Sequence, residues 1–304
     1  MAAPARIAAY RRVVIGSDWF LLGAPWDCSG TGRGEARAPE ALRKAGLARL
    51  IDIDLGDAAT QVTSSHRDEA TGVRALPETI AAAHQLAGAL WTGVRDHPGR
   101  RPLVLGGDCS LLLGVFARAP EPLGLWILDG HPDYLDPHDS DTGETADLEL
   151  AVLTGAGPPS LLALGHRAPM VAARHVALIG HRTAGLDAAS AAELARLPAE
   201  LHAIGAGTVL DDPAGAGRRA ATWADQLARP MWLHLDVDVL DPSALPAVTY
   251  PQPGGPDLDQ LAAVLAPLAA APALVGVSVA DFRPDLDPDG RQAARLVALL
   301  DRAL

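Results

Sequence analysis

The chain has 304 residues, of which 49% are hydrophobic and 20% are charged, and its formal net charge is −12. This much apolar material excludes a disordered chain, because disorder requires low hydrophobicity together with a high charge density. The acidic balance argues against a general nucleic-acid or anionic-membrane surface, since either would need positive patches. We therefore expect a globular protein with a solvated acidic exterior that binds neither nucleic acid nor membrane.

The cysteine content and the apolar runs predict a location for the protein. The two cysteines, Cys28 and Cys109, are too few for a disulfide framework. Residues 1–12 contain no apolar segment ahead of a cleavage site, so no secretory signal is expected. Charged residues, glycines and prolines interrupt every apolar run before it reaches the length of a membrane span. These features predict a cytoplasmic protein with reduced thiols.

Short apolar runs alternate with longer amphipathic ones along the chain. The predicted strands are residues 20–23, 50–55, 103–105, 125–128, 176–179, 231–237 and 274–279. The predicted helices are residues 39–50, 77–95, 110–117, 188–197, 258–265 and 291–304. Strands that are separated by helices pair in parallel through right-handed crossovers. The pattern therefore predicts an α/β fold.

Two segments are predicted to lie outside these elements. Residues 136–147 are polar and acidic and should form a loop. Residues 205–217 are rich in glycine and alanine and are predicted to be an exposed connection. Neither segment has the composition of an interdomain linker, and no repeat period is visible, so we expect one domain spanning residues 1–304.

The ends of three predicted strands carry unusual polar residues, and ligands of open parallel sheets bind beyond the carboxyl ends of the strands. The first of these segments, residues 103–110, reads LVLGGDCS. Its two glycines permit a sharp turn before Asp108, Cys109 and Ser110. The simplest interpretation is a strand, a turn and a helix that Asp108 or Ser110 caps.

The second strand end, residues 125–133, reads LWILDGHPD. Asp129, His131 and Asp133 occupy alternate positions, and alternate side chains of an extended backbone point to one face. Two carboxylates and an imidazole on one face are costly unless a cation joins them. The alternative is a solvated turn.

The third strand end, residues 231–242, reads MWLHLDVDVLDP. Asp236 and Asp238 alternate at the end of a strongly apolar strand, where neighbouring like charges are costly and a divalent metal would reverse that cost. A helix-capping turn is the alternative, but a third carboxylate at Asp241 argues against it. Pro242 ends the strand because it has no N–H to donate.

Together, the second and third strand ends supply five oxygen or nitrogen ligands, and Cys109 adds a candidate sulfur. Such a set suits Mn²⁺ better than a structural zinc site, which prefers cysteine and histidine. Two metals that share carboxylates would use every ligand, and a water between them could ionise near neutral pH and attack an electrophilic carbon. Cys109 could instead be a small buried residue that only packs.

These three segments carry a resemblance to a known family. GGDCS, DGHPD and DVDVLDP resemble, in the same order, the motifs GGDHS, DAHxD and DxDxxDP of the ureohydrolases: arginase, agmatinase, formimidoylglutamase and guanidino-acid hydrolases. Residues 23–43 and 54–57 look like the family's opening region, and residues 281–284 look like its late Glu-x-Asn-Pro element. The resemblance covers nearly the whole chain. It implies a three-layer α/β/α sandwich around a mainly parallel eight-stranded sheet.

The resemblance also implies a chemistry and a ligand set. Family members hydrolyse guanidino or amidino groups with two Mn²⁺ ions and a hydroxide that bridges them. By motif, Asp129 and Asp236 would bridge the ions, and Asp133 would also orient the hydroxide. The remaining ligands would be Cys109 and Asp133 for one ion, and His131 and Asp238 for the other. The implied partner is a small guanidino-type substrate, and the implied assembly is a homotrimer or homohexamer.

Two departures from the family pattern affect the metal and the substrate. Cys109 stands where the family has its first metal-ligand histidine, which resembles a branch that includes Nω-hydroxy-L-arginine amidinohydrolases. A thiolate donates more charge than an imidazole, so that ion could be a weaker Lewis acid or could be underoccupied. Asp281 replaces a glutamate that grips the guanidinium and is shorter by one methylene. Its grip then requires a substrate that sits deeper or carries an extra donor.

The features specific to arginases are poorly preserved. Leu135 replaces an asparagine, and Ala146 or a neighbour falls where arginases keep a proton-shuttle histidine. Gly185 and Ala188 fall where arginases have acidic residues for the substrate amino group. The predicted acidic loop and its end offer three spare carboxylates, Glu144, Asp147 and Glu149. They could contact a cationic substrate or pass protons, or they could belong to a solvated loop.

We expect a Mn²⁺-dependent amidinohydrolase that produces an amine and urea or a substituted urea. The candidate catalytic residues are Asp133, Asp281 and Glu144, and the candidate substrate-binding residues are Asp281, Glu144 and Asp147. The expected substrate is an N-hydroxylated or otherwise substituted guanidine rather than L-arginine. The alternatives are a formimino or other C–N hydrolase on the same fold, and a degenerate member that binds metal or a ligand without turnover.

Overall fold

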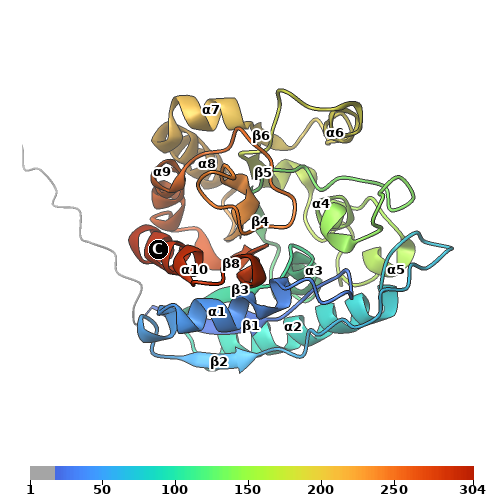
Figure 1. Cartoon of the computed structure of the whole chain (residues 1–304), viewed down its shortest axis with the longest axis horizontal. Helices are drawn as coiled ribbons and strands as arrows, with labels where there is room; N and C mark the ends of the chain where they lie inside the picture. Colours follow the sequence, from blue (N-terminus) through green and yellow to red (C-terminus); the bar gives the residue numbers. More distant parts are fainter. Residues whose placement is uncertain (1–17) are drawn as a thin grey trace, which may run out of the picture.

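The computed structural model describes residues 18–304, and these residues contain one eight-stranded parallel sheet. Its strand order is β2-β1-β3-β8-β7-β4-β5-β6, which Figure 1 shows rising from β2 at the bottom to β6 at the top. The strands are β1 (Trp19–Ala24), β2 (Asp54–Asp57), β3 (Arg101–Gly106), β4 (Gly124–Leu128), β5 (Val176–Ile179), β6 (His202–Ile204), β7 (Met231–Asp236) and β8 (Leu274–Ala280). The prediction that residues 1–12 carry no secretory signal concerns a segment outside the described residues.

The connections between the strands are mostly helical. The α-helices are α1 (Ala38–Lys44), α2 (Leu76–Asp96), α3 (Leu111–Ala117), α4 (Glu149–Leu153), α5 (Pro159–Leu162), α6 (Ala188–Leu194), α7 (Ala206–Asp211), α8 (Pro213–Leu227), α9 (Leu258–Ala269) and α10 (Arg291–Ala303). The 3₁₀ helices are η1 (Glu35–Arg37), η2 (Leu47–Arg49), η3 (Thr145–Asp147), η4 (Ala173–His175), η5 (Val237–Val239) and η6 (Pro284–Leu286). Within residues 18–304, no helix combines the length and the apolar character that crossing a membrane requires.

Helices cover both faces of the sheet. Alternate side chains of a strand point to opposite faces, so Leu21 and Leu103 join the core under α1, α8, α9 and α10. Phe20 and Val104 join the core under α2, α3, α4 and α5. Figure 1 shows α8, α9 and α10 on one side of the strands and α3, α4 and α5 on the other. The predicted three-layer α/β/α sandwich is confirmed.

Local sequence explains why the long helices form where they do. Helix α2 has Pro77 in its first turn, where a backbone N–H would have no hydrogen-bond partner within the helix. Its buried residues recur three or four positions apart, as Ala83, Leu86 and Leu90 do, so one face lies on the sheet. Helix α9 begins with a capping box in which Asp257 and Gln260 satisfy each other's backbone N–H groups.

The prediction of an exposed connection over residues 205–217 is wrong, because this segment contains α7 and the start of α8. Asp212 caps α8 by accepting the Gly215 N–H at 2.8 Å. A Cβ atom on Gly217 would lie 2.2 Å from the Val264 oxygen of α9. The small residues therefore allow two helices to pack closely, and they do not mark a loop.

The short and peripheral elements also differ from the prediction. The predicted strand at residues 50–55 is displaced to β2, and the preceding helix ends at Lys44, earlier than predicted. Strand β2 is an exposed edge that Arg43 secures through ion pairs to Asp54 at 2.8 Å and Asp57 at 2.5 Å. Strand β6 was missed because three residues carry little periodicity.

Candidate active site

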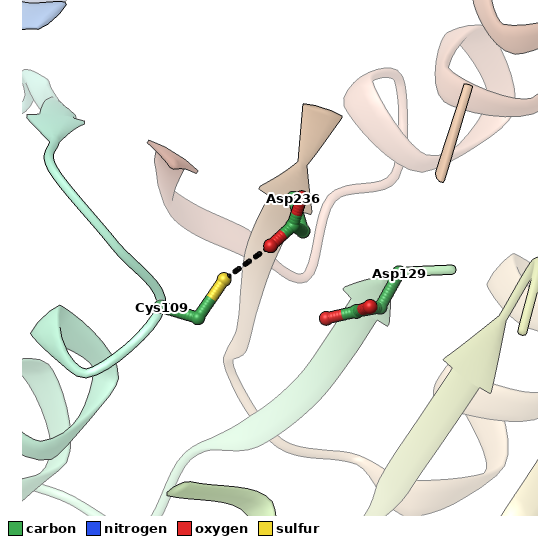
Figure 2. Close-up of side chains that lie close together, drawn as sticks. All are labelled: Cys109, Asp129 and Asp236. Carbon is green, nitrogen blue, oxygen red and sulfur yellow. Dashed lines mark hydrogen bonds between the residues drawn. The ribbon is translucent and has the colours of Figure 1, made fainter. Parts of the chain in front are cut away.

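The carboxyl ends of four parallel strands meet at one edge of the sheet, because β3, β8, β7 and β4 are consecutive neighbours. Cys109 follows β3, Asp129 follows β4, Asp236 ends β7 and Asp281 follows β8. Figure 2 shows the side chains of Cys109, Asp129 and Asp236 directed toward a common space. Residues more than a hundred positions apart in the sequence thus become neighbours.

The six predicted metal ligands form overlapping groups in which the ligand atoms lie within 4.8 Å of one another. The four groups are Cys109, Asp129 and Asp236; Asp129, His131 and Asp238; Asp129, Asp133 and Glu149; and Asp236, Asp238 and Asp281. Because Asp129 belongs to three of the four, it is placed as a carboxylate shared by adjacent cations would be.

On one side of the cluster, Cys109 is held by two polar neighbours. Its S–H donates to Asp236 Oδ2 at 2.6 Å, and its sulfur lies 3.1 Å from His234 Nε2. Burial and the charge of Asp236 raise the pKa of the Cys109 thiol well above its usual value. Burial lowers the pKa of His234 to about 3, so this ring is neutral at physiological pH.

On the other side, His131 and Asp238 neutralise each other. His131 Nδ1 lies 2.9 Å from Asp238 Oδ2 and 3.7 Å from Asp129 Oδ1. Burial disfavours the charged ring, but the two carboxylates outweigh burial and raise the pKa of His131. Burial likewise disfavours the Asp238 carboxylate, but His131 outweighs it and lowers the pKa of Asp238. A cation bound here would take the place of the ring proton.

Several buried carboxylate oxygens in the cluster lack a partner. Within residues 18–304, neither Asp129 Oδ2 nor either oxygen of Glu149 has a hydrogen bond. Burial and neighbouring carboxylates raise the pKa of Asp129, Asp133, Asp236 and Glu149 above the usual values. Buried like charges at these distances are costly unless a cation compensates them. The oxygen-rich donor set, with one imidazole and one thiol, therefore fits a pair of divalent cations such as Mn²⁺.

Two acidic residues of the cluster have a left-handed backbone that is unusual outside glycine. Asp133 has φ 46° and Asp281 has φ 65°. The Asp281 N–H donates to the Gly107 oxygen at 2.7 Å. A Cβ atom on Gly107 would lie 1.6 Å from the Trp26 oxygen, so only glycine allows the Trp26 backbone to lie this close to position 107. Such strain is concentrated where side chains are aimed at a functional site.

A pocket of about 530 Å³ opens onto the cluster, and acidic side chains dominate its lining. The acidic lining residues are Asp108, Asp133, Asp139, Asp141, Asp147, Glu193, Asp236, Asp238 and Asp281. Among the described lining residues, the basic ones are Arg33 and His131. A concave site with this excess of negative charge attracts a cationic ligand.

Asp281 faces the cluster from β8. One of its oxygens lies within 4.8 Å of ligand atoms of Asp236 and Asp238. Its Oδ2 also accepts the Thr249 N–H at 3.3 Å. Burial and the charge of Asp238 raise the pKa of Asp281. This carboxylate is therefore placed to pair with a cationic group at the floor of the pocket.

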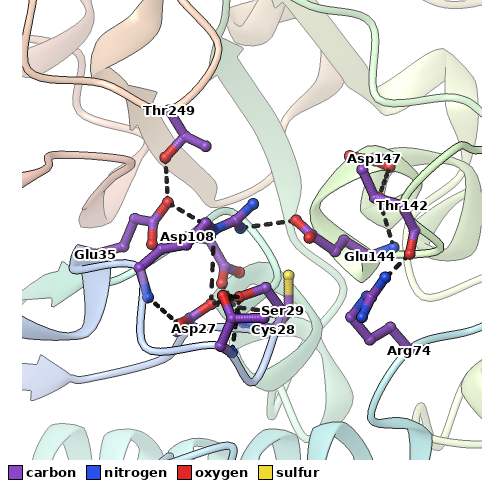
Figure 3. A network of polar contacts seen from close by, with 12 residues as sticks. Asp27, Cys28, Ser29, Glu35, Arg74, Asp108, Thr142, Glu144, Asp147 and Thr249 are labelled. Atoms are coloured by element: carbon purple, nitrogen blue, oxygen red, sulfur yellow. Dashed lines mark hydrogen bonds and ion pairs between the residues drawn. The ribbon is translucent and has the colours of Figure 1, made fainter. Parts of the chain in front are cut away.

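A network of ion pairs surrounds Arg33 beside the pocket. Arg33 lies 2.7 Å from Glu144 Oε2 and 3.5 Å from Glu35 Oε1, and Glu35 also accepts the Thr249 hydroxyl. Figure 3 shows Glu144 directed toward this network and Asp147 beside Thr142. Burial raises the pKa of Glu144 to about 7 although Arg33 opposes the shift. Arg33 therefore already compensates two buried acids.

The structure brings most of the sequence-derived candidates together. Glu144 instead faces Arg33 and is not part of the pocket lining, whereas Asp147 is. The solvated-loop alternative is wrong for Glu149, which is fully buried. The turn alternative at β7 is also present in part, because Asp236 Oδ1 accepts the Asp238 N–H at 2.7 Å and caps η5. That contact leaves Oδ2 directed toward Cys109.

Sequence reasoning missed several residues at the site. His234 could have been found, because it lies two residues before Asp236 in β7 and continues the alternation of Asp236 and Asp238 in the sequence. Glu193 lies in α6, lines the pocket and accepts the Tyr134 N–H at 2.9 Å. No local signal singles out Glu193, Arg33 or Glu35, because none of them follows a strand that carries a motif.

Comparison with known proteins agrees with this geometry. The model of the Arginase family matches residues 17–304. Arginase from Brevibacillus brevis is 30% identical over 295 residues, which cover 92% of this chain and 95% of that protein. The structure of arginase from Bacillus caldovelox has a TM-score of 0.83 at 29% identity and covers 94% of this chain and 98% of that one. Formimidoylglutamase from Bacillus subtilis shares the fold, with a TM-score of 0.74 at 18% identity and coverage of 97% and 88%.

The fold, the strand-end cluster and the acidic pocket thus define a hydrolase of the ureohydrolase type, which acts on C–N bonds in linear amidines. The chain belongs to the arginase family. The family resemblance of the three motifs is confirmed.

Proposed function

We propose that the protein is a Mn²⁺-dependent amidinohydrolase that hydrolyses a guanidino or N-hydroxyguanidino compound to an amine and urea or a substituted urea. The main support is the convergence of six candidate ligand residues from three strand ends on one cluster, and five of these residues line an acidic pocket. The pocket suits a small cationic substrate, because its carboxylates outnumber its basic side chains.

The six ligands divide between two cations in this proposal. Asp129 and Asp236 are the shared carboxylates. Cys109 and Asp133 would hold one ion, and His131 and Asp238 would hold the other. When bound, the two ions would supply Lewis acidity and make a water molecule more acidic.

The residues of the chain would bind and orient the reactants. Asp133, whose left-handed backbone directs it into the cluster, orients the attacking water and accepts a hydrogen bond from it. Asp281 accepts N–H groups of the substrate head group from the pocket floor. Asp147 on the pocket wall favours a second positive charge farther along the substrate. Glu144 acts through Arg33, which it pairs with at 2.7 Å.

Two features favour an N-hydroxylated head group. Asp281 is one methylene shorter than the glutamate of the family motif, and a C–C bond of about 1.5 Å leaves room for an added oxygen. The hydroxyl also lowers the basicity of the guanidine, so the leaving amine depends less on a proton shuttle. Apolar Leu135 and Ala146 line the pocket where the family motif would place an asparagine and a shuttle histidine.

A substrate panel with Mn²⁺ tests the proposal. L-arginine, agmatine, 4-guanidinobutyrate, Nω-hydroxy-L-arginine and one formimino compound, N-formimino-L-glutamate, are compared by kcat/KM, with urea, hydroxyurea and formamide measured as products. We expect the hydroxylated compound to be preferred by about tenfold, equivalent to about 1.4 kcal/mol of transition-state discrimination.

Other outcomes of this panel separate the alternatives. Faster hydrolysis of an unmodified guanidine would reject the hydroxyguanidine preference and leave an amidinohydrolase. Formamide released from a formimino compound, with no urea or hydroxyurea from the panel, would replace the proposal with a formimino hydrolase. Absence of bound divalent metal after loading, measured by plasma emission, would reject the metal site.

A further inference from the structure

A chain of hydrogen bonds lies behind Cys109 and runs through three buried side chains. Trp232 Nε1 lies 2.9 Å from Ser278 Oγ, and Ser278 Oγ lies 2.7 Å from His234 Nδ1. His234 Nε2 lies 3.1 Å from Cys109 Sγ, which in turn lies 2.6 Å from Asp236 Oδ2. The side chains of Trp232, His234 and Ser278 are wholly inaccessible to solvent.

The sheet fixes this chain of contacts in place. His234 and Ser278 are directly paired in the register of β7 and β8, and Ser278 is paired with Val104 of β3. Cys109 follows the end of β3, so the contacts cross three adjacent strands. His234 precedes Asp236 by two residues and therefore points to the same face of β7. The positions of the sulfur and the ring are thus set by strand pairing.

The donor chemistry fixes which atom donates and which accepts in each of the four hydrogen bonds from Trp232 to Asp236. An indole N–H can only donate, so Ser278 Oγ accepts from Trp232. The remaining partner of Ser278 among the described residues is His234 Nδ1, which must accept the hydroxyl hydrogen. The neutral ring then carries its hydrogen on Nε2 and donates it to the Cys109 sulfur. The opposite tautomer would leave the Ser278 hydrogen without an acceptor in this buried place.

We propose that His234 is a positioning residue that holds the Cys109 sulfur for the metal on its side of the cluster. This inference rests on the proposed function, since it assigns Cys109 as a ligand. Because a cysteine ligand must be deprotonated, Cys109 would lose its thiol proton to solvent, and with it the contact to Asp236, when a metal binds. The hydrogen bond from His234 Nε2 would remain, because the pairing of β7 with β8 and the contact to Ser278 hold the ring in place.

The hydrogen bond from His234 would offset the extra negative charge that a cysteine ligand brings to the metal. A thiolate donates more charge to a metal than an imidazole does, and a hydrogen bond to the sulfur withdraws part of that charge. Cys109 thus stands where the family motif has a ligand histidine, and His234 lies directly behind it. Loss of such an outer hydrogen bond typically weakens metal binding by about 10- to 100-fold.

Cobalt titration of the metal-free full-length protein tests the role of His234. Co²⁺ alone is the probe, followed by calorimetry and by the near-ultraviolet thiolate-to-cobalt charge-transfer band, which Cys109→Ser should abolish. His234→Phe keeps a ring of similar size but removes both nitrogens. We expect it to weaken one Co²⁺ site by at least about tenfold and to shift the band to longer wavelength, because the sulfur becomes more electron-rich.

Three further variants make the outcome decisive. His234→Gln keeps an N–H donor near the Nε2 position and should restore part of the affinity and the band position. Ser278→Ala frees the tautomer of His234 and should give a smaller shift, which also provides a test if His234→Phe does not fold. His181→Gln changes a buried histidine after strand β5, which β4 separates from β7, and should behave as wild type.

The inference and the proposed function fail in different ways. Wild-type affinity and band position in both His234→Phe and Ser278→Ala would overturn the role of His234 and leave the metal site standing. Failure of the wild-type protein to bind Co²⁺ or Mn²⁺ would overturn the two together. A wild-type protein that binds metal without the charge-transfer band would remove Cys109 as a ligand, and with it the role of His234.

Discussion

The two sides of the strand-end cluster compensate their buried carboxylates in different ways. On the His131 side, the ring and Asp238 form an ion pair at 2.9 Å, and the His131 side chain is 20% exposed. On the Cys109 side, the residues are buried and a neutral thiol contacts Asp236, with His234 behind it. In the proposed metal site, a cation would therefore displace a proton on the His131 side, whereas buried hydrogen bonds would position the sulfur on the Cys109 side.

The largest expected effect comes from removing a carboxylate that the two cations of the proposed site would share. Asp236→Ala should abolish activity and eliminate the thermal stabilisation by Mn²⁺, because a ligand that binds only the native state stabilises it by mass action. Asp241→Ala, in the same motif, is the matched control, because Asp241 bonds to Ser243 and Gly254 and lies outside the cluster. Metal analysis and thermal melts with and without Mn²⁺ provide the measurement. Retained Mn²⁺ stabilisation in Asp236→Ala would contradict the shared role.

A smaller effect should distinguish the two sides. His131→Ala and Cys109→Ala should each reduce the bound metal from about two ions to about one, and lower kcat/KM by about 100-fold or more. Cys109→His should tighten its site, because it restores the ligand of the family motif. Calorimetric titration with Mn²⁺ resolves the sites. Metal content and activity equal to wild type in Cys109→Ala would return Cys109 to a packing role.

At the substrate end of the pocket, a substitution of Asp281 should change the preference between substrates by about one order of magnitude. Asp281→Glu restores the longer acid of the family motif and fills the space assigned to the added oxygen. We expect the ratio of kcat/KM for Nω-hydroxy-L-arginine to that for L-arginine to fall by about tenfold. Asp285→Glu, at an acid that pairs with Arg283 at 2.6 Å, serves as the control. An unchanged ratio in Asp281→Glu would remove Asp281 from substrate selection.

The smallest expected effect is on the stability of the metal-free protein. Burial raises the pKa of Asp108 to about 6 and that of Glu144 to about 7. The folded protein thus holds these protons more tightly than the unfolded chain does. Their contribution to stability is full below about pH 4 and is lost as the pH rises through about 6 to 7. Thermal melts after chelation should show Tm falling by about 2–4 °C over this range.

Neutral variants of these two acids check the assignment. Asp108→Asn and Glu144→Gln remove the titrating groups and should flatten that part of the pH profile. The same slope in both variants would assign the pH dependence to other carboxylates. Saturating Mn²⁺ should raise Tm most at the upper end of the range, because metal binding competes with protons for the cluster.

The strands that carry the motifs were predicted well. Long apolar runs such as Met231–Asp236 have a strong signal, and they end in the acidic residues that mark the site. The predictions were least accurate where packing decided the structure. Gly217 belongs to a helix because α9 lies against it, and Glu149 is buried because its short helix α4 packs against α3 and α5. Neither neighbour is visible in the local sequence.

By itself, the sequence determined the parallel α/β architecture, the family and the residues that converge at the strand ends, because periodicity and motif spacing are local properties. Only the tertiary structure decided which side chains stand behind those residues. His234 faces Cys109 because β7, β8 and β3 are adjacent, although the two residues lie 125 positions apart in the chain. Glu144 faces Arg33 for a similar reason, since contacts between distant segments depend on strand order and packing rather than on local pattern.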